Sequence, residues 1–153
     1  MPTESKWEAP ASIVTYFSTG LNSLADGANR MGAKIDNVAD GENEMFIDLE
    51  LNLAATSSRD ADARIEIYVL YSIDDTNFDM GAGTEGMSSV DPRPEALLHV
   101  FSLDAATTTR YRTVANLPLA PFDFKLLLMN EMGVAFFGSG STLKYRLHSA
   151  ESQ

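Results

Sequence analysis

The side chains that most often carry out catalysis are scarce in this sequence. The chain has 153 residues, with no cysteine and two histidines, His99 and His148. The lack of cysteine excludes a disulfide, a thiolate zinc site and a cysteine nucleophile. Both histidines lie in alternating, strand-like stretches, and neither has a second histidine four residues away, as a zinc-binding helix requires. We therefore expect both to be packed or solvated, and we predict no catalytic residue.

Two glycine-rich segments are candidate sites for a nucleophile or a phosphate. Residues 138–141 read Gly-Ser-Gly-Ser, which lacks the G-x-S-x-G pattern of a nucleophile elbow and is typical of a turn. Residues 81–83 read Gly-Ala-Gly, but they follow an aspartate-rich turn and lead into no helix that would bind a phosphate. The sequence therefore predicts no cofactor, and it predicts that the chain is not an enzyme.

Residues 75–79 have the spacing of a calcium-binding loop. Asp75, Asn77 and Asp79 match the first three ligands of that loop, but Met80 replaces its glycine and Gly86 replaces its bidentate glutamate. We therefore expect a turn whose side chains hydrogen-bond their own backbone, with an irregular Ca²⁺ site as the alternative. A pair of carboxylates that hydrolyses sugars is a more distant alternative, because most acidic residues fall in turns or on polar strand faces.

Aromatic side chains near the N-terminus are candidates for contact with a partner. Trp7 lies in a polar segment before the first expected strand, and Tyr16 and Phe17 end that strand. An apolar ring in such a segment needs either the domain's own core or a neighbour's surface. A carbohydrate-binding module would also use exposed rings as a platform. Three further rings are expected to fill the interior, namely Phe122, Phe124 and Tyr145.

The elements that must position these residues are strands, because apolar side chains recur at every second position. In residues 45–53, methionine, isoleucine and leucine alternate with a largely polar set. Both faces of residues 64–73 are fairly apolar, which places this strand in the middle of a sheet. Further strands are expected at residues 96–103, 108–115, 122–130 and 143–147, with weaker candidates at 12–17, 33–37 and 135–137.

The connections between these strands decide the fold class. Residues 21–31 come nearest to an amphipathic helix, but Gly27 interrupts them. Most connections are short turns, whereas residues 79–94 are expected to form a surface excursion that carries contacts. About eight short strands predict an all-β protein, an antiparallel β-sandwich with a jelly-roll-like fold. Residues 1–10 are expected to be a flexible arm, and residues 11–153 a single domain.

The balance of charge and hydropathy excludes several partners. The chain has 22 acidic and 11 basic residues and a net charge of −11, so we expect no nucleic-acid and no membrane partner. No apolar run approaches the roughly 18 residues of a membrane span, and we expect a protein made in a cytoplasm. Residues 1–100 contain 18 acidic and 6 basic side chains, whereas residues 101–153 contain 4 and 5. This asymmetry indicates either two different faces or simply acidic loops in the first part.

Three stretches together resemble a family of small phage proteins. They are LNSLADG followed by KIDN in residues 21–37, the strand and D-x-T-N-aromatic turn of residues 65–78, and LPLAPFDFK followed by GSGSTLKYR in residues 117–146. Over roughly residues 14–149 this layout resembles the capsid decoration (cement) proteins of tailed bacteriophages, which have jelly-roll-like folds. These motifs are turns and strands, so they indicate a fold and a family rather than a site.

The resemblance implies a virion component on the outside of a phage head, without enzyme activity. Such a protein binds the major capsid protein and staples neighbouring subunits, here as a homodimer or homotrimer. A cysteine-free fold, an acidic surface and an extended arm suit this role. In this interpretation Trp7, Tyr16 and Phe17 contact the capsid or another partner. The alternative is a carbohydrate-binding β-sandwich module of a phage tail or head surface.

Overall fold

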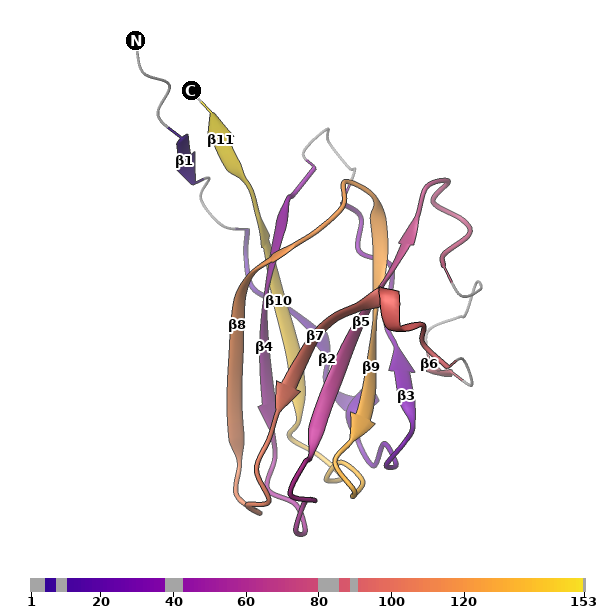
Figure 1. Ribbon diagram of the computed structural model, residues 1–153, viewed down its shortest axis with the longest axis vertical. Coiled ribbons are helices and arrows are strands. Elements are labelled where there is room, and N and C mark those ends of the chain that lie inside the picture. Colours follow the sequence, from indigo (N-terminus) through magenta and orange to yellow (C-terminus); the bar gives the residue numbers. More distant parts are fainter. Residues whose placement is uncertain (1–4, 8–10, 38–42, 80–85, 89–90, 153) are drawn as a thin grey trace.

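The computed structural model describes residues 5–7, 11–37, 43–79, 86–88 and 91–152 (Figure 1). Within these ranges the chain forms antiparallel strands and two short 3₁₀ helices, η1 (Thr19–Leu21) and η3 (Pro94–Ala96). No helix in this part of the chain is long and apolar enough to cross a membrane. The prediction of an all-β protein is confirmed.

Two sheets lie against each other, and a short ribbon projects from one corner of them (Figure 1). The four-stranded sheet has the order β2 (Val14–Phe17), β10 (Thr142–His148), β4 (Phe46–Leu53) and β8 (Arg110–Pro118). The five-stranded sheet has the order β6 (Gly86–Ser88), β3 (Asn29–Met31), β9 (Asp123–Glu131), β5 (Arg64–Ser72) and β7 (Leu97–Ser102). The ribbon pairs β1 (Ser5–Trp7) with β11 (Ala150–Ser152).

The order of the strands is that of a jelly roll. β2 pairs with β10, β3 with β9, β4 with β8 and β5 with β7, so early strands pair with late ones in a nested series. Such a series is one long hairpin rolled into two sheets, as the sequence predicts. β6 is a short addition beside β3.

Most strands lie where the alternation of side chains predicts them, and the exceptions are short. Residues 33–37 form only an isolated bridge between Ile35 and Phe124, and the strand lies earlier, at β3. The Asn-Arg-Met sequence of β3 has no apolar alternation that would reveal it. Residues 135–137 are irregular, with Phe136 buried and Phe137 exposed. Of the predicted surface excursion, residues 80–85 and 89–90 lie outside the described residues, and residues 86–88 form β6.

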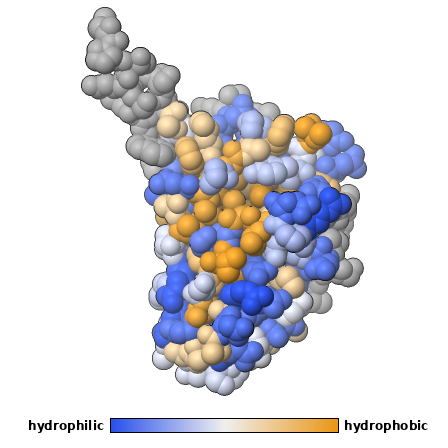
Figure 2. Space-filling view, in the orientation of Figure 1, coloured by the Kyte–Doolittle hydropathy of each residue, from blue (hydrophilic) through white to orange (hydrophobic). Residues whose placement is uncertain are grey.

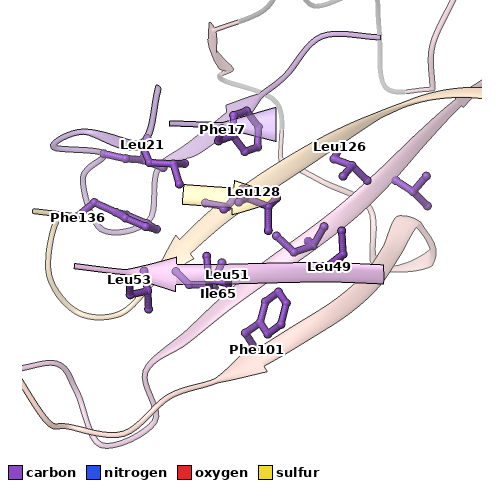
Figure 3. Close-up of a cluster of buried hydrophobic side chains, with 14 of the residues drawn as sticks. Phe17, Leu21, Leu49, Leu51, Leu53, Ile65, Phe101, Leu126, Leu128 and Phe136 are labelled. Carbon is purple, nitrogen blue, oxygen red and sulfur yellow. The ribbon is translucent and has the colours of Figure 1, made fainter. Parts of the chain in front are cut away.

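Apolar side chains from both sheets meet between them (Figure 3). Leu49 and Leu51 from β4 pack in one cluster with Ile65 from β5 and with Leu126 from β9, and each is at most 1% exposed. Burying such a side chain contributes roughly 2 kcal/mol to folding. Phe17 is 4% exposed and belongs to the same cluster. The structure therefore places Phe17 in the core. The expectation that Phe17 contacts a partner is wrong, because its side chain is buried.

Tyr16 joins the two sheets at one edge of the sandwich. Its hydroxyl donates to the carbonyl oxygen of Ala33 at 2.6 Å and accepts the backbone N–H of Leu126 at 2.9 Å. Its ring also makes edge contacts with the rings of Phe17 and Tyr145, with centroids 4.6 and 5.8 Å away. Tyr16 was predicted to contact a partner, but in the structure its polar and apolar parts are both engaged within the domain.

The rings expected to fill the interior do so to different degrees. Phe124 is fully buried between the sheets, and Tyr145 is half-buried against the same cluster. Phe122 is 38% exposed, because it lies in the turn before β9 rather than on the strand itself. Its ring instead makes an edge contact with Tyr71, with the centroids 6.3 Å apart.

A second apolar cluster covers the outer face of the five-stranded sheet. Met31, Tyr68, Leu70 and Leu127 are buried there together with Ala96 of η3. The segment that leads into β7 therefore packs over this face. β5 has apolar neighbours on both sides and lies between β9 and β7, so its predicted central place is confirmed.

The acidic first part and the nearly neutral last part of the chain do not form separate faces. β10 lies between β2 and β4, β9 lies between β3 and β5, and β8 pairs with β4. Each sheet therefore contains strands from both parts, and the uneven charge does not divide the molecule into two faces.

The close approach of Tyr16 to Gly32 predicts a specific loss of stability. A Cβ atom on Gly32 would lie 2.3 Å from Cε1 of Tyr16. We expect Gly32→Ala to lower the free energy of unfolding by about 1–3 kcal/mol, because the ring must move away from its two hydrogen bonds. The matched control is Gly138→Ala, whose Cβ would meet nothing nearer than Ser23 Oγ at 3.9 Å. Urea unfolding of both variants measures the difference, and equal midpoints would contradict the role given to Tyr16.

Candidate functional site

The residues predicted as calcium ligands lie in the turn after β5, but their side chains have other partners. Asp74 holds the turn: one carboxylate oxygen accepts the backbone N–H groups of Thr76 at 3.0 Å and Asn77 at 2.7 Å. The Asn77 amide donates to the other oxygen at 2.7 Å. These bonds, led by the one from the backbone of Asn77, hold the pKa of Asp74 well below its usual value. This is the self-bonded turn that the sequence analysis expected.

The other two candidate ligands, Asp75 and Asp79, each lie beside a different basic side chain of the protein. Asp75 accepts a hydrogen bond from Lys34 Nζ at 2.6 Å, and Asp79 lies 3.8 Å from Arg93. Lys34 also lies 3.3 Å from the buried Asp123, so the lysine ammonium occupies the space between these acids. Within the described ranges, no three His, Cys, Asp or Glu side chains are grouped closely enough to hold a metal ion. Asp75 and Asp79 thus contact different basic side chains, and Asn77 contacts Asp74.

A buried carboxylate lies on the outer side of the four-stranded sheet. Asp48 on β4 accepts hydrogen bonds from Arg146 Nε at 2.6 Å and from the backbone N–H of Asn116 at 2.8 Å. Nε2 of His148, whose ring stacks on Phe46, lies 3.1 Å from the same carboxylate. Burial raises the pKa of Asp48, but the bonds from Asn116, Arg146 and His148 outweigh it and lower the pKa overall. Ionised Asp48 thus ties β4 to β8 and β10.

A groove of about 230 Å³ runs beside this cluster on the same outer face. Its charged lining consists of two ion pairs between neighbouring strands, Arg146 with Asp48 at 2.6 Å and Lys144 with Glu50 at 2.8 Å. Ile13 contributes an exposed apolar side chain to the lining. The size suits a small polar molecule, but a ligand would have to compete with ion pairs that are already complete.

Both histidines are packed, as the sequence predicts. His148 is 6% exposed and is not among the residues that line the groove. His99 on β7 is half-buried, with its ring centroid 4.6 Å from that of Phe101, and burial lowers its pKa.

Trp7, the remaining predicted contact residue, lies on β1. Its backbone pairs with that of Ala150, in a register that also sets Lys6 opposite Glu151. The arm expected at residues 1–10 is thus paired with the other end of the chain over residues 5–7. Sequence reasoning missed this pairing because β1 and β11 are three residues long and show no alternation.

The open edge of the sandwich carries an apolar surface that the sequence analysis did not identify. Figure 2 shows hydrophobic residues gathered over β7 and towards β8, in the middle of the face that it presents. Leu97 is 41% exposed, and four half-buried side chains accompany it. We call Leu97, Leu98, Val100, Val114 and Leu117 the edge patch. Alternation reveals which face of a strand is apolar, but it does not reveal which strand lies at an edge.

Comparisons with known proteins add no identification. No family model matches the sequence, and no curated protein matches it.

The lowered pKa of Asp48 predicts how stability changes in acid. A carboxylate whose pKa is lower in the folded state stabilises the fold above its ordinary pKa of 3.8, and this contribution is lost as the pH falls through the folded value. We therefore expect Asp48→Asn to lower the free energy of unfolding at pH 7 by about 2 kcal/mol, since Arg146 and Asn116 lose a charged acceptor. Below pH 3 the difference from the unaltered protein should shrink.

Chemical denaturation at several pH values measures this effect. Glu95→Gln is the control, because Glu95 is an exposed carboxylate on η3. A stability difference for Asp48→Asn that stays constant from pH 7 to pH 2.5 would contradict the proposed ionisation of Asp48.

Proposed function

We propose that this chain is a structural virion protein, a capsid decoration (cement) protein that binds the outside of a phage head and staples neighbouring major capsid subunits. The sequence resemblance to phage decoration proteins supports this proposal. The observation that carries it is the ribbon of β1 and β11, which projects beyond the sandwich (Figure 1). A rigid domain with a projecting arm is suited to attachment rather than to catalysis.

The ribbon is short, and a neighbouring strand would add to its stability. It contains three residue pairs, Ser5 with Ser152, Lys6 with Glu151 and Trp7 with Ala150. An isolated two-stranded ribbon is marginally stable at best in water, and its outer edges carry unpaired backbone groups. A capsid surface that added a strand or a pocket for Trp7 would supply the missing stabilisation.

Exposed apolar side chains surround the base of the ribbon. Ile13 and Val14, which lead into β2, are 64% and 44% exposed. Met45 is 51% exposed, and its backbone N–H donates to Ser149 Oγ, next to the start of β11. A partner that bound the ribbon would also cover these side chains, and the burial of apolar surface would add to the affinity.

The alternative function, carbohydrate binding, has less support from the geometry. A sugar platform needs an exposed ring beside free polar groups. The groove on the four-stranded sheet is lined by Tyr145, which is half-buried, while the well exposed Tyr111 is not part of its lining. We therefore favour a protein surface as the partner.

Removal of the arm should separate folding from attachment. We expect deletion of residues 1–10 to leave the circular dichroism spectrum unchanged and to weaken binding to heads that lack the protein. Trp7→Ala should reproduce much of this loss, with at least a tenfold weaker affinity, because a large aromatic anchor often dominates an interface. Cosedimentation with purified heads measures both.

The control is Phe137→Ala. Phe137 is 55% exposed and lies in the turn between β9 and β10, at the end of the sandwich away from the ribbon (Figure 1). It should bind heads normally. Full occupancy of heads by the truncated protein would place the contact elsewhere and contradict the role of the arm.

A further inference from the structure

We propose that β7 is an interface between two copies of this chain. Two β7 strands would pair antiparallel across a two-fold axis at Val100, so that the five-stranded sheets of both copies join into one continuous sheet. This proposal concerns a surface away from the ribbon, and it does not depend on attachment to a phage head.

Among the strands that the structure describes, none pairs with the outer edge of β7. β7 ends the five-stranded sheet and pairs with β5 on one side only, from Ser102 opposite Arg64 to Leu97 opposite Tyr68. Its other side presents a row of backbone N–H and C=O groups over six residues. Such a row is a template for a further strand.

β7 lacks the charges and the proline that usually protect an edge strand. Its sequence, Leu-Leu-His-Val-Phe-Ser, contains no proline, lysine, arginine, aspartate or glutamate. β8, the edge of the other sheet, carries Arg110 and Arg112 at its start and Pro118 at its end, with a bulge in its pairing with β4. Charges and proline both discourage pairing between edges. The pairing of β7 with β5 also shifts register, between Ile67 and Tyr68, so the difference between the two edges lies in charge and proline. The two edges lie at the same side of the sandwich, and β7 is the one left open to a second strand.

The side chains around the unpaired edge favour burial. Leu97 is exposed, and Leu98 and Val100 are half-buried, so three of the six residues of β7 place apolar surface in the edge patch. Figure 2 shows that this apolar surface continues beyond the strand, towards β8. A second copy would therefore bury apolar area as well as satisfy the backbone.

Charges at the two ends of β7 favour an antiparallel arrangement. Asp91, Arg93 and Glu95 are exposed before the start of the strand, and together they carry a net charge of −1. At its other end, Arg112 donates to the backbone oxygen of Ser102, and Arg110 on β8 is paired with Asp104 at 3.0 Å, so these three charged side chains carry a net charge of +1. A two-fold axis brings the acidic end of one copy to the basic end of the other, whereas a parallel arrangement would set like charges together.

The position of the axis follows from the faces of the strand. In an antiparallel pair, residues opposite each other lie on the same face of the sheet, whereas adjacent residues of one strand lie on opposite faces. The two-fold axis must therefore set one residue opposite the same residue of the second copy, and not opposite the next residue along the strand. An axis at Val100 sets His99 opposite the partner's Phe101, an aromatic contact of the kind that His99 already makes with Phe101 in its own chain. An axis at His99 would instead oppose two imidazole rings.

A single cysteine tests this arrangement, because the natural chain has none. Val100→Cys would place two thiols opposite each other, with Cα atoms about 4.5–5.5 Å apart, within the range for a disulfide. Under mild oxidation we expect near-complete covalent dimer. Tyr111→Cys is the control: Tyr111 is 66% exposed on β8, and should crosslink at least tenfold more slowly.

A second measurement uses the chain without cysteine. Sedimentation equilibrium should show a dimer for the unaltered protein and at least a tenfold weaker association for Val100→Lys, which would oppose two like charges at the axis. Circular dichroism checks that both variants are folded. A monomer at high micromolar concentration, or a dimer in which Val100→Cys crosslinks no faster than Tyr111→Cys, would overturn the proposal. Since neither experiment uses heads, failure here would leave the proposed attachment to capsids untouched.

Discussion

Every strand of the sandwich must direct an apolar side chain between the sheets at alternate positions, and the other features of the molecule follow from this requirement. Leu49 and Leu51 take the inner positions of β4, which leaves Asp48 and Glu50 on the outer face. There they meet basic residues of β10 and form cross-strand ion pairs. The charged groups of this sheet thus join its strands across the outer face, while the apolar side chains pack between the sheets.

The nested pairing of early and late strands makes the two edges of the sandwich different. At one edge Tyr16 crosses from β2 to the backbone of Leu126 on β9, and Gly32 leaves the space for its ring. At the other edge β7 and β8 both lack a further neighbour within the described part of the chain, although Arg112 reaches from β8 to the backbone oxygen of Ser102 on β7. A closed edge gives rigidity, whereas an open apolar edge gives a place for association. Both features suit the proposed role in an assembly.

The sequence predicted the jelly-roll fold because its long strands carry a strong signal of period two, as in β4, β5 and β9. Short strands such as β3 and β1 have too few residues for that signal, and their places depend on pairing with distant segments. The same limit explains Tyr16 and Phe17: their types suggested a contact surface, but only the position of β2 beside β10 shows that they face inwards. The edge patch was missed because the sequence does not show which strand ends a sheet. Asp75, Asn77 and Asp79 have the spacing of calcium ligands. In the structure, however, Asp75 accepts a hydrogen bond from Lys34, which is distant in sequence.

The central proposal, that this protein decorates a phage head, is tested most directly by the composition of purified particles. Heads and tails separated from virions produced together with this chain can be analysed by quantitative mass spectrometry. The proposal predicts that the chain copurifies with heads in a fixed ratio to the major capsid protein and is released by conditions that leave the shell intact. Its recovery with tails, or in an amount that varies from one preparation to another, would contradict the proposal.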